Sequence, residues 1–181
     1  MTNYFYSDAL KSERLVTRFL TEDDIIPWTS FCADEESIEF FPKLKLITPQ
    51  QASEQWIRKQ MDRYSENRYG LQAILHKQTG ELIGQCGLLA QEVGERKELE
   101  VGYHVFKKFW GQGYAPEAAK AFITYAFQHN IVDSVISIID VKNIKSQKVA
   151  EKNNLVQDTQ LTWNEIEAFI YRIKKTNFQK Q

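Results

Sequence analysis

Hydrophobic residues recur along this chain with two spacings, and each spacing predicts one kind of element. Alternating or continuous apolar runs predict strands over residues 15–19, 69–75, 82–89, 99–106, 135–139, 155 onward and 166–173. Helical spacing and helix-start residues, such as Thr21 with Asp24 and Thr48 before Pro49, predict helices over residues 21–32, from 48, over 116–129 and over 144–152. The order β-α-α-β-β-β-α-β-α-β-β predicts an α/β (α+β) fold in which a mixed sheet carries helices on both faces.

The 181 residues are predicted to form a single domain, because no repeat, low-complexity tract or flexible linker divides residues 1–181. A net charge of −1 lacks the basic excess that is typical of nucleic-acid-binding proteins. The N-terminal residues do not resemble a signal peptide, and no apolar run approaches the roughly 18 residues that cross a bilayer. We therefore expect a cytoplasmic protein without a nucleic-acid or membrane partner.

The sequence contains few residues suited to metal or redox chemistry. Cys32 and Cys86 lie far apart and form no CxxC motif, so we expect two reduced structural thiols. The histidines, His76, His104 and His129, are scattered and have no metal-ligand spacing. We interpret all three as structural and predict no metal site.

The segment from Phe109 to Pro116 joins a predicted strand to a predicted helix through Gly111 and Gly113. The two glycines allow a tight turn and a close approach of a ligand to the backbone. Ala115 offers no side-chain acceptor and Pro116 has no N–H, so the other donors at the helix start lack a local partner. A phosphate or diphosphate would satisfy those donors, with Lys107 and Lys108 adding positive charge. The simpler alternative is a solvated helix start.

Two familiar phosphate-binding motifs are excluded. There is no GxxxxGK[ST] sequence, so the turn is not a P-loop. The third glycine of GxGxxG is also missing, and the turn follows about the fourth strand rather than the first, which disfavours a dinucleotide-binding fold.

Four segments, taken in this order, resemble the GCN5-related N-acetyltransferase (GNAT) superfamily, in particular the branch of the RimJ and RimL ribosomal-protein N-terminal acetyltransferases. They are residues 12–24 (SERLVTRFLTEDD), 80–87 (GELIGQCG), 99–118 (LEVGYHVFKKFWGQGYAPEA) and 143–155 (NIKSQKVAEKNNL). The resemblance spans about residues 12–173. It departs from the superfamily pattern at Trp110, where Gln or Arg is frequent, and at Asn154-Leu155, where Gly-Phe is usual.

The resemblance implies a mostly antiparallel sheet of about seven strands flanked by about four helices, and an acetyl-CoA-dependent N-acetyltransferase activity. It implies that the diphosphate of the cofactor lies on the glycine turn and that the pantetheine arm lies beside the fourth strand. The residues that it assigns to cofactor contact are His104, Val105, Phe106, Trp110, Gly111, Gln112, Gly113, Tyr114, Ala115, Asn143 and Ser146.

Acetyl transfer to an amine requires that the amine be neutral when it attacks, so an ammonium must first lose a proton to a base. Glu100, Gly102 and His104 lie on one face of the predicted strand. Similar enzymes carry a carboxylate at the equivalent strand position, so Glu100 is our first candidate for the base, either directly or through water. Glu165 is a second candidate by resemblance to RimL, and structural pairing of Glu100 is the alternative.

The leaving thiolate needs a proton or a stabilising donor. Ser146 is the candidate by resemblance, as a cofactor contact, a proton donor or both. Capping of the following helix, with Asn143 in the preceding loop, is the structural alternative. Tyr103 and Tyr114 are further candidate donors, although aromatic residues at such positions are more often part of the core.

Two other sets of residues belong, by resemblance, near the acceptor cleft. Trp28 and Trp56 would line the cleft or pack in the core. An acidic stretch would attract a cationic amine or form a solvated face; its members are Asp34, Glu35, Glu36 and Glu39.

The main hypothesis is an N-acetyltransferase that works by direct attack in a ternary complex, because no motif positions a nucleophilic cysteine. An acyl-CoA-binding or regulatory module without turnover is the alternative from another class, and a nucleotide-binding module is the third. The acceptor, a protein N-terminus or a small-molecule amine, is not specified by the sequence. The chain is expected to be a monomer or a homodimer.

Overall fold

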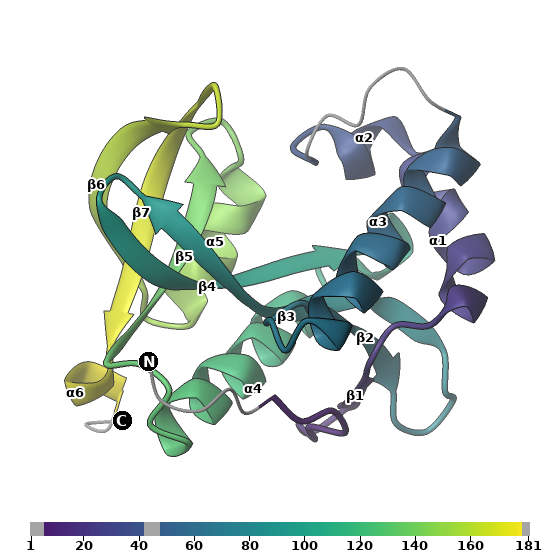
Figure 1. The fold of residues 1–181 in the computed structure, drawn as a ribbon, viewed down its shortest axis with the longest axis horizontal. Coiled ribbons are helices and arrows are strands. Elements are labelled where there is room, and N and C mark those ends of the chain that lie inside the picture. Colours follow the sequence, from purple (N-terminus) through teal and green to yellow (C-terminus); the bar gives the residue numbers. More distant parts are fainter. Residues whose placement is uncertain (1–5, 42–47, 179–181) are drawn as a thin grey trace.

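A seven-stranded sheet forms the centre of the molecule, with the strand order β1-β2-β3-β4-β5-β7-β6 (Figure 1). The computed structural model describes residues 6–41 and 48–178. Neighbouring strands are antiparallel except for β4 and β5, which are parallel. The strands are β1 (Leu15–Arg18), β2 (Leu71–His76), β3 (Leu82–Val93), β4 (Arg96–Val105), β5 (Ser134–Asp140), β6 (Val156–Trp163) and β7 (Ile166–Lys174).

Six α-helices accompany the sheet within the described residues. They are α1 (Ile25–Cys32), α2 (Glu35–Ile38), α3 (Pro49–Ser65), α4 (Tyr114–Gln128), α5 (Ile144–Lys152) and α6 (Lys175–Phe178), and two short 3-10 helices, η1 (Glu22–Asp24) and η2 (Lys107–Phe109), precede α1 and α4. The predicted order of strands and longer helices is confirmed. The short α2 and α6 were not predicted, because helices of one turn leave almost no periodic signal.

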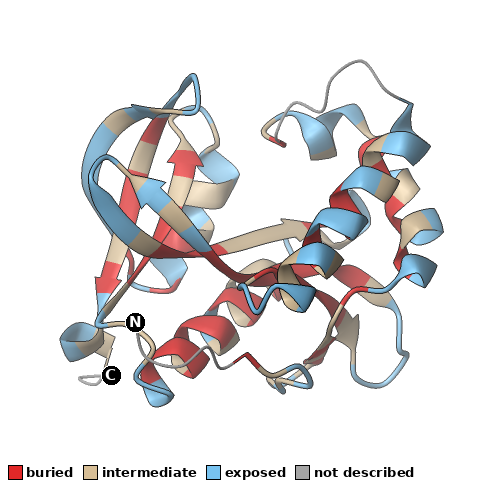
Figure 2. Ribbon diagram, in the orientation of Figure 1, coloured by how far each residue is buried: buried red, intermediate tan, exposed pale blue. Residues whose placement is uncertain are grey.

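Two groups of buried side chains hold helices to opposite faces of the sheet, as the sequence predicted. On one face, Phe122 of α4 packs with Leu88 of β3 and Val101 of β4. On the other, Trp28 of α1 and Ile57 of α3 pack in a second group with residues of β2 and β3. Figure 2 shows the buried residues concentrated in the central strands and in the sides of α3 and α4 that face them.

The start of α3 shows how local sequence fixes an element. The Thr48 hydroxyl accepts a hydrogen bond from the Gln51 N–H at 3.2 Å, and the Gln51 side chain accepts one from the Thr48 N–H at 3.0 Å. This reciprocal pair is a capping box, with Pro49 in the first turn. Helix α3 therefore begins where the sequence predicted, and this beginning fixes which of its faces meets the sheet.

The parallel strands β4 and β5 are joined at one residue pair, Glu100 with Ile136, in the described part of the chain. Strand β3, in contrast, pairs with β4 along its length, from Gly84–Val105 to Val93–Arg96. Figure 1 shows β4 and β5 running apart from their meeting point. We call the opening between them the fork. It leaves one edge of β4 without a neighbouring strand from about residue 102 onward.

Both cysteines are buried and free, as predicted. Burial raises the pKa of the Cys32 thiol to about 11 and raises that of Cys86 further, so both stay protonated at neutral pH. Among the described helices, none combines the length and the apolar character needed to cross a membrane.

Candidate active site

The glycine turn before α4 has the conformation that its sequence predicted. Gly111 and Gly113 have φ values of 77° and 82°, in the left-handed region that favours glycine. Gly113 is the N-cap of α4 and makes no side-chain capping bond. The expected helix start at Pro116, with Ala115 before it, was therefore wrong by two residues, because the left-handed Gly113 starts the helix earlier. The first-turn N–H donors of Tyr114 and Ala115 precede the proline, and nothing lies within 4 Å of a Cβ built on Gly111.

Arg14 holds this turn from behind. Its Nη1 donates to the Gln112 carbonyl at 2.9 Å, and its Nε donates to the Glu117 carboxylate at 2.7 Å. The Arg14 guanidinium also lies 4.3 Å from the centre of the Tyr114 ring. Burial opposes ionisation of Glu117, but hydrogen bonds from Ser12 and Arg14 outweigh it and lower the pKa of its carboxyl. With its carbonyl held by Arg14, the turn is fixed in place while its other side stays open.

We expected Lys107 and Lys108, before the turn, to add positive charge for a phosphate. Instead, both lysines form ion pairs with carboxylates. Lys107 pairs with Glu36 at 2.5 Å and Lys108 with Glu81 at 2.6 Å. Lys145 of α5 lies over the Trp110 ring at 4.0 Å, and 3.9 Å from Glu36. Each of these three lysines near the turn therefore has a carboxylate partner. Glu36 is the partner of both Lys107 and Lys145.

Strand β4 presents backbone groups to the fork. The Val101 carbonyl accepts from the Ser137 hydroxyl of β5 at 2.8 Å, and the Val105 carbonyl accepts from the Trp110 indole at 2.7 Å. Both groups point away from β3, and alternate residues of a strand direct their backbone groups to the same side. The N–H and C=O of Tyr103 therefore also face the fork. Tyr103 lies beyond Glu100, the residue at which β4 pairs with β5.

Glu100 lies at the closed end of the fork and is buried. Its carboxylate accepts a hydrogen bond from the Gln91 amide at 2.7 Å and a longer one from the Ile138 N–H at 3.4 Å. Burial raises the pKa of the Glu100 carboxyl, while the two hydrogen bonds and the charge of Arg63 oppose the rise. Such a carboxyl takes up a proton more readily than an exposed one, which suits a base.

Ser146 lies on the other face of β4, next to Tyr103. The Tyr103 hydroxyl is 2.9 Å from the Ser146 hydroxyl and 3.0 Å from the Ser146 carbonyl. Burial raises the pKa of Tyr103, which stays protonated at neutral pH. Ser146 is not the cap of α5, because the Asn143 side chain accepts from the Ser146 N–H at 3.0 Å and is itself the N-cap. The serine hydroxyl is therefore not used for capping.

The end of β4 carries aromatic contacts. His104 lies on the Glu100 face, and its ring centre is 5.0 Å from that of Phe41 and 5.5 Å from that of Trp56. Burial lowers the pKa of His104 to about 4, so the imidazole is neutral at pH 7. Val105 packs on the α4 face, and Phe106 packs edge-on against Trp28 at 5.2 Å.

Several of the other candidate side chains pack against aromatic or buried residues. Trp28 is fully buried in the core, and Tyr114 is buried beneath Arg14. The His76 ring packs edge-on against the Tyr114 ring, and the His129 ring packs against the Tyr125 ring. Glu165 lies in the exposed turn between β6 and β7, with φ at 69°.

The acidic stretch is not simply a solvated face. The Asp34 carboxylate accepts from the Ser37 N–H at 2.8 Å and so caps α2, while Glu36 pairs with Lys107. Glu35 and Glu39 are exposed at either end of α2. Asp34 and Glu36 both lie at ion-pair distance from Lys107 and so hold α2 to the segment before the glycine turn.

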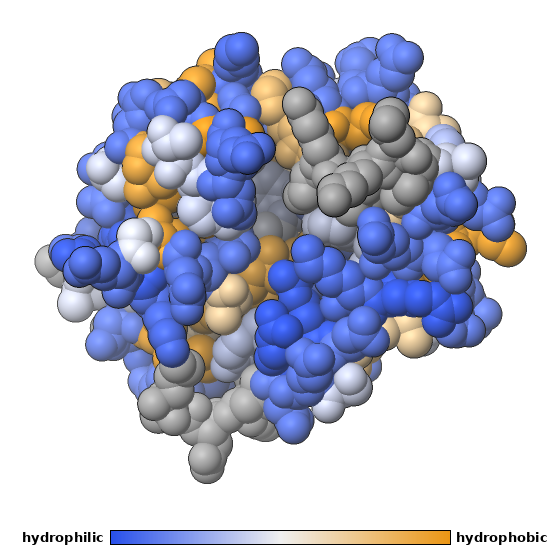
Figure 3. All heavy atoms as spheres, turned by 45° about the horizontal axis from the view of Figure 1, so that its top comes forward, coloured by the Kyte–Doolittle hydropathy of each residue, from blue (hydrophilic) through white to orange (hydrophobic). Residues whose placement is uncertain are grey.

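The site fits a coenzyme A thioester better than it fits a metal. An uncapped helix start with open space above it suits a diphosphate, and a free strand edge suits the amide groups of a pantetheine arm. No group of three or more metal-ligating side chains occurs among the described residues. Figure 3 shows the surface hollowed between the part that carries α5 and β5–β7 and the part that carries α1–α3.

The sequence profile of the family described as "Acetyltransferase (GNAT) domain" matches residues 14–156. The chain belongs to the GNAT family. Members of this family are acetyltransferases.

Known proteins are similar to this GNAT domain over most of its length. The uncharacterized protein YkkB of Bacillus subtilis is 31% identical over 147 residues, which cover 80% of this chain and 82% of that protein. The uncharacterized N-acetyltransferase p20 of Bacillus licheniformis is 27% identical, covering 83% and 86%. The structure of the ribosomal alpha-N-protein acetyltransferase RimL in complex with coenzyme A has a TM-score of 0.73 at 16% identity, covering 90% and 95%, which shows a shared fold.

Three residues of this GNAT domain's site were missed by the sequence reasoning. Arg14 lies inside the segment that carried the family resemblance, and a charged residue there could have been weighed as a partner for Glu117. Gln91, which donates to Glu100, and Arg63, which acts on it electrostatically, reach the site only through strand pairing and helix packing. No local pattern marks them.

Proposed function

We propose that the protein transfers the acetyl group of acetyl-CoA to a primary amine by direct attack in a ternary complex. The observation that carries this proposal is the fork, with the buried Glu100 carboxylate at its closed end. The acceptor class, a protein N-terminus or a small-molecule amine, is part of the proposal.

Several groups of this chain would hold acetyl-CoA. The N–H donors of the Trp110–Ala115 turn would bind the diphosphate, and the backbone of Tyr103 and its neighbours would bind the pantetheine arm. The complex of RimL with coenzyme A supports the choice of ligand. When bound, acetyl-CoA supplies an activated acetyl group as a thioester.

The reaction needs a proton removed from the acceptor and a proton returned to sulfur. Glu100 takes one proton from the ammonium group, and the neutral amine nitrogen bonds to the acetyl carbonyl carbon. The carbon–sulfur bond breaks and its electron pair leaves with sulfur. The nitrogen loses a second proton as the amide forms, and this proton balances the one that the sulfur takes up. The products are an N-acetyl amine and coenzyme A thiol, and one proton is released to solvent when Glu100 is deprotonated again.

Under this proposal, Ser146 and Tyr103 would serve the leaving group. A carbonyl can only accept, so the single Tyr103 proton goes either to the Ser146 carbonyl or to the Ser146 hydroxyl. In the second arrangement the Ser146 proton is free to turn toward the sulfur. Because Glu100 and Tyr103 lie on opposite faces of β4, the amine and the leaving sulfur have separate proton partners.

The test is release of free thiol from acetyl-CoA in the presence of a panel of amines and peptides, with calorimetric titration of coenzyme A alongside. We expect coenzyme A to bind and thiol to appear only when an acceptor is present. Binding without acceptor-dependent thiol release would favour an acyl-CoA-binding module without turnover. Failure of coenzyme A to bind would overturn both, and competition by ATP would then favour a nucleotide-binding module.

A further inference from the structure

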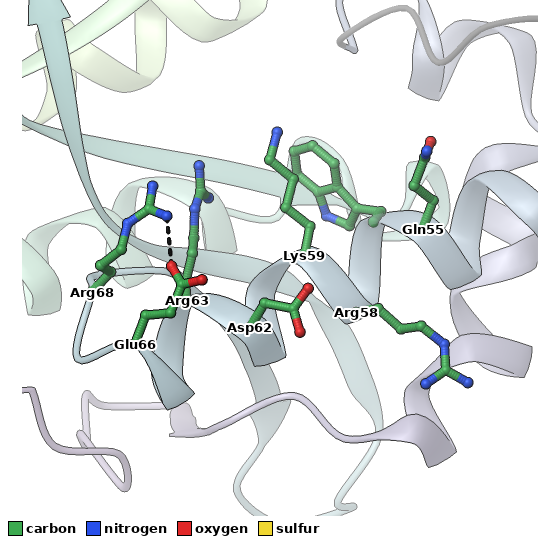
Figure 4. A pocket seen from close by; sticks show the side chains of 8 residues that line it. Gln55, Arg58, Lys59, Asp62, Arg63, Glu66 and Arg68 are labelled. Carbon is green, nitrogen blue, oxygen red and sulfur yellow. Dashed lines mark hydrogen bonds and ion pairs between the residues drawn. The ribbon is translucent and has the colours of Figure 1, made fainter.

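A groove of about 580 Å³ runs along α3 on the Glu100 side of the sheet. This volume is within the range of small-molecule sites. Six of the residues that line it are charged, and Figure 4 shows how they lie. The lining residues are Gln55, Trp56, Arg58, Lys59, Asp62, Arg63, Glu66 and Arg68.

Four of the charged residues are basic and two are acidic, in a chain whose net charge is −1. Arg58 pairs with Glu22 at 2.6 Å and with Glu54 at 3.0 Å, and it points away from the other cations in Figure 4. Arg68 pairs with Glu66 at 2.8 Å. Within residues 6–41 and 48–178, neither Lys59 nor Arg63 has a carboxylate at ion-pair distance. Their charges are therefore available to a ligand.

Arg63 is held in place by a neutral group. Its Nη1 donates at 3.0 Å to the side-chain oxygen of Gln60, which also accepts from the Leu71 N–H at 3.0 Å. Gln60 is fully buried, so this contact fixes the guanidinium without neutralising it. Lys59 projects to the same side of α3 as Arg63 and Arg68 (Figure 4).

Two residues that line the groove, Arg63 and Trp56, interact with residues of β4. Arg63 and Glu100 act on each other electrostatically, each favouring the charged form of the other. Trp56 lines the groove and also packs against His104, two residues beyond Glu100 on the same face of β4. Burial and the neighbouring Arg63 and Arg68 lower the pKa of Lys59, as expected where like charges gather.

An acceptor amine is an ammonium in water, and two cations that form no ion pair within the described residues repel it from this side of the site. An anionic group elsewhere on the acceptor reverses that effect. We propose that the acceptor is a primary amine that also carries a carboxylate or phosphate, and that Lys59 and Arg63 bind this anionic group while the amine faces Glu100. This inference rests on the proposed function and narrows its acceptor class.

The test compares pairs of acceptors in which one member carries an anionic group and the other does not. Phosphoethanolamine is compared with ethanolamine, β-alanine with β-alaninamide, and short peptides with glutamates after the N-terminal residue with the same peptides bearing glutamines. The first two pairs test free anionic amines, and the third tests the acidic side chains of a peptide. We expect kcat/KM to be at least about 10-fold higher for the anionic member of at least one pair, and to fall as salt screens the charges.

The decisive variant is K59M/R63M, which keeps the aliphatic stems and removes both charges. The matched control is R58M, because Arg58 lines the same groove but is already paired and points away. We expect the anionic preference to disappear in K59M/R63M and to persist in R58M. Equal use of both members of every pair, or a preference that survives in K59M/R63M, would overturn the inference.

A binding measurement distinguishes failure of the proposed acetyl transfer from failure of the proposed anion site. If no acceptor releases thiol, the proposed function fails, and binding of the glutamate peptide and of phosphoethanolamine is measured by Trp fluorescence with coenzyme A present and absent. Binding that is lost in K59M/R63M and kept in R58M then supports the anion site. Equal or absent binding in all three proteins rejects it. Circular dichroism confirms that each variant is folded.

Discussion

At the scale of single residues, Glu100 shows how position gives a common side chain a particular chemistry. The carboxylate is buried at the fork, and it accepts hydrogen bonds from one amide side chain and one backbone N–H. Burial disfavours its charge while these donors favour it, and burial is the larger effect. The result is a carboxyl with a raised pKa, which loses its proton at a higher pH than an exposed glutamate does.

Replacing Glu100 by Gln tests its role as the base. We expect kcat to fall by about 100-fold or more while acetyl-CoA affinity changes little, because the amine would have to lose its proton to solvent. In the native protein kcat/KM should fall as pH drops through the raised pKa of Glu100, since the protonated carboxyl cannot accept a proton. Turnover of E100Q that equals the native rate between about pH 6 and 9 would remove Glu100 from this role.

The same substitution should also change how the stability of the protein depends on pH. The direction of this change follows from the raised pKa of Glu100. A carboxyl whose pKa is raised in the folded state contributes stability below its unfolded pKa, and that contribution is lost as pH rises through the folded value. E100Q has no carboxyl that titrates in this window, so only the native protein loses this stability as pH rises. The melting temperature of E100Q minus that of the native protein should therefore increase through the window and then become constant. Thermal melts of both proteins across pH measure the difference. A constant difference would contradict the raised pKa.

Sequence reasoning located residues whose role depends on local context and missed those that depend on packing. Glu100 and Ser146 follow from strand alternation and from a family motif, and their roles in catalysis stay predictions. Arg63 comes from a helix far earlier in the chain and approaches Glu100 only because α3 packs on that face of the sheet. Lys107 and Lys108 were expected at a phosphate, but carboxylates from distant segments pair with them.

At the scale of elements, the glycine turn and α4 act together. The turn needs two left-handed residues, and Gly113 sets the first turn of the helix behind it. Strands and longer helices could be predicted because period and capping are local properties, as Thr48 and Gln51 show at α3. The predicted start of α4 was wrong because Pro116 marks a first turn but does not say which of its positions it occupies.

Replacing Gly111 by Ala tests whether the turn binds the cofactor. The added methyl group would project into the open space above the turn, and we expect the dissociation constant of acetyl-CoA to rise about 10-fold. Gly80 is the matched control, because its φ is 71° and the space around its Cβ is equally empty. Both variants should lose about 1 kcal/mol of stability from backbone strain. Equal cofactor affinity in G111A and G80A would contradict a phosphate site at this turn.

At the scale of the whole molecule, the hydrogen-bonded sheet is nearly two sheets. Strands β1–β4 and β5–β7 share one backbone pairing, while the core beneath α4 is continuous across both. An extended ligand beside β4 would supply hydrogen bonds where the sheet lacks them. We expect the Tyr103 and Val105 amides to exchange with solvent quickly in the free protein and slowly with acetyl-CoA bound. Hydrogen exchange measures this, and unchanged rates at these two amides would argue against a ligand along β4.

Under the proposed function, the fork would link the lifetime of the protein to the concentration of acetyl-CoA. A ligand that binds the folded chain alone adds about 2.7 kcal/mol of stability at 100 times its dissociation constant. Under the proposed function, folding and acetyl-CoA supply are thus coupled. When acetyl-CoA is scarce, a larger fraction of the molecules opens and meets proteases. The abundance of the enzyme would then follow the supply of acetyl groups without any separate sensor.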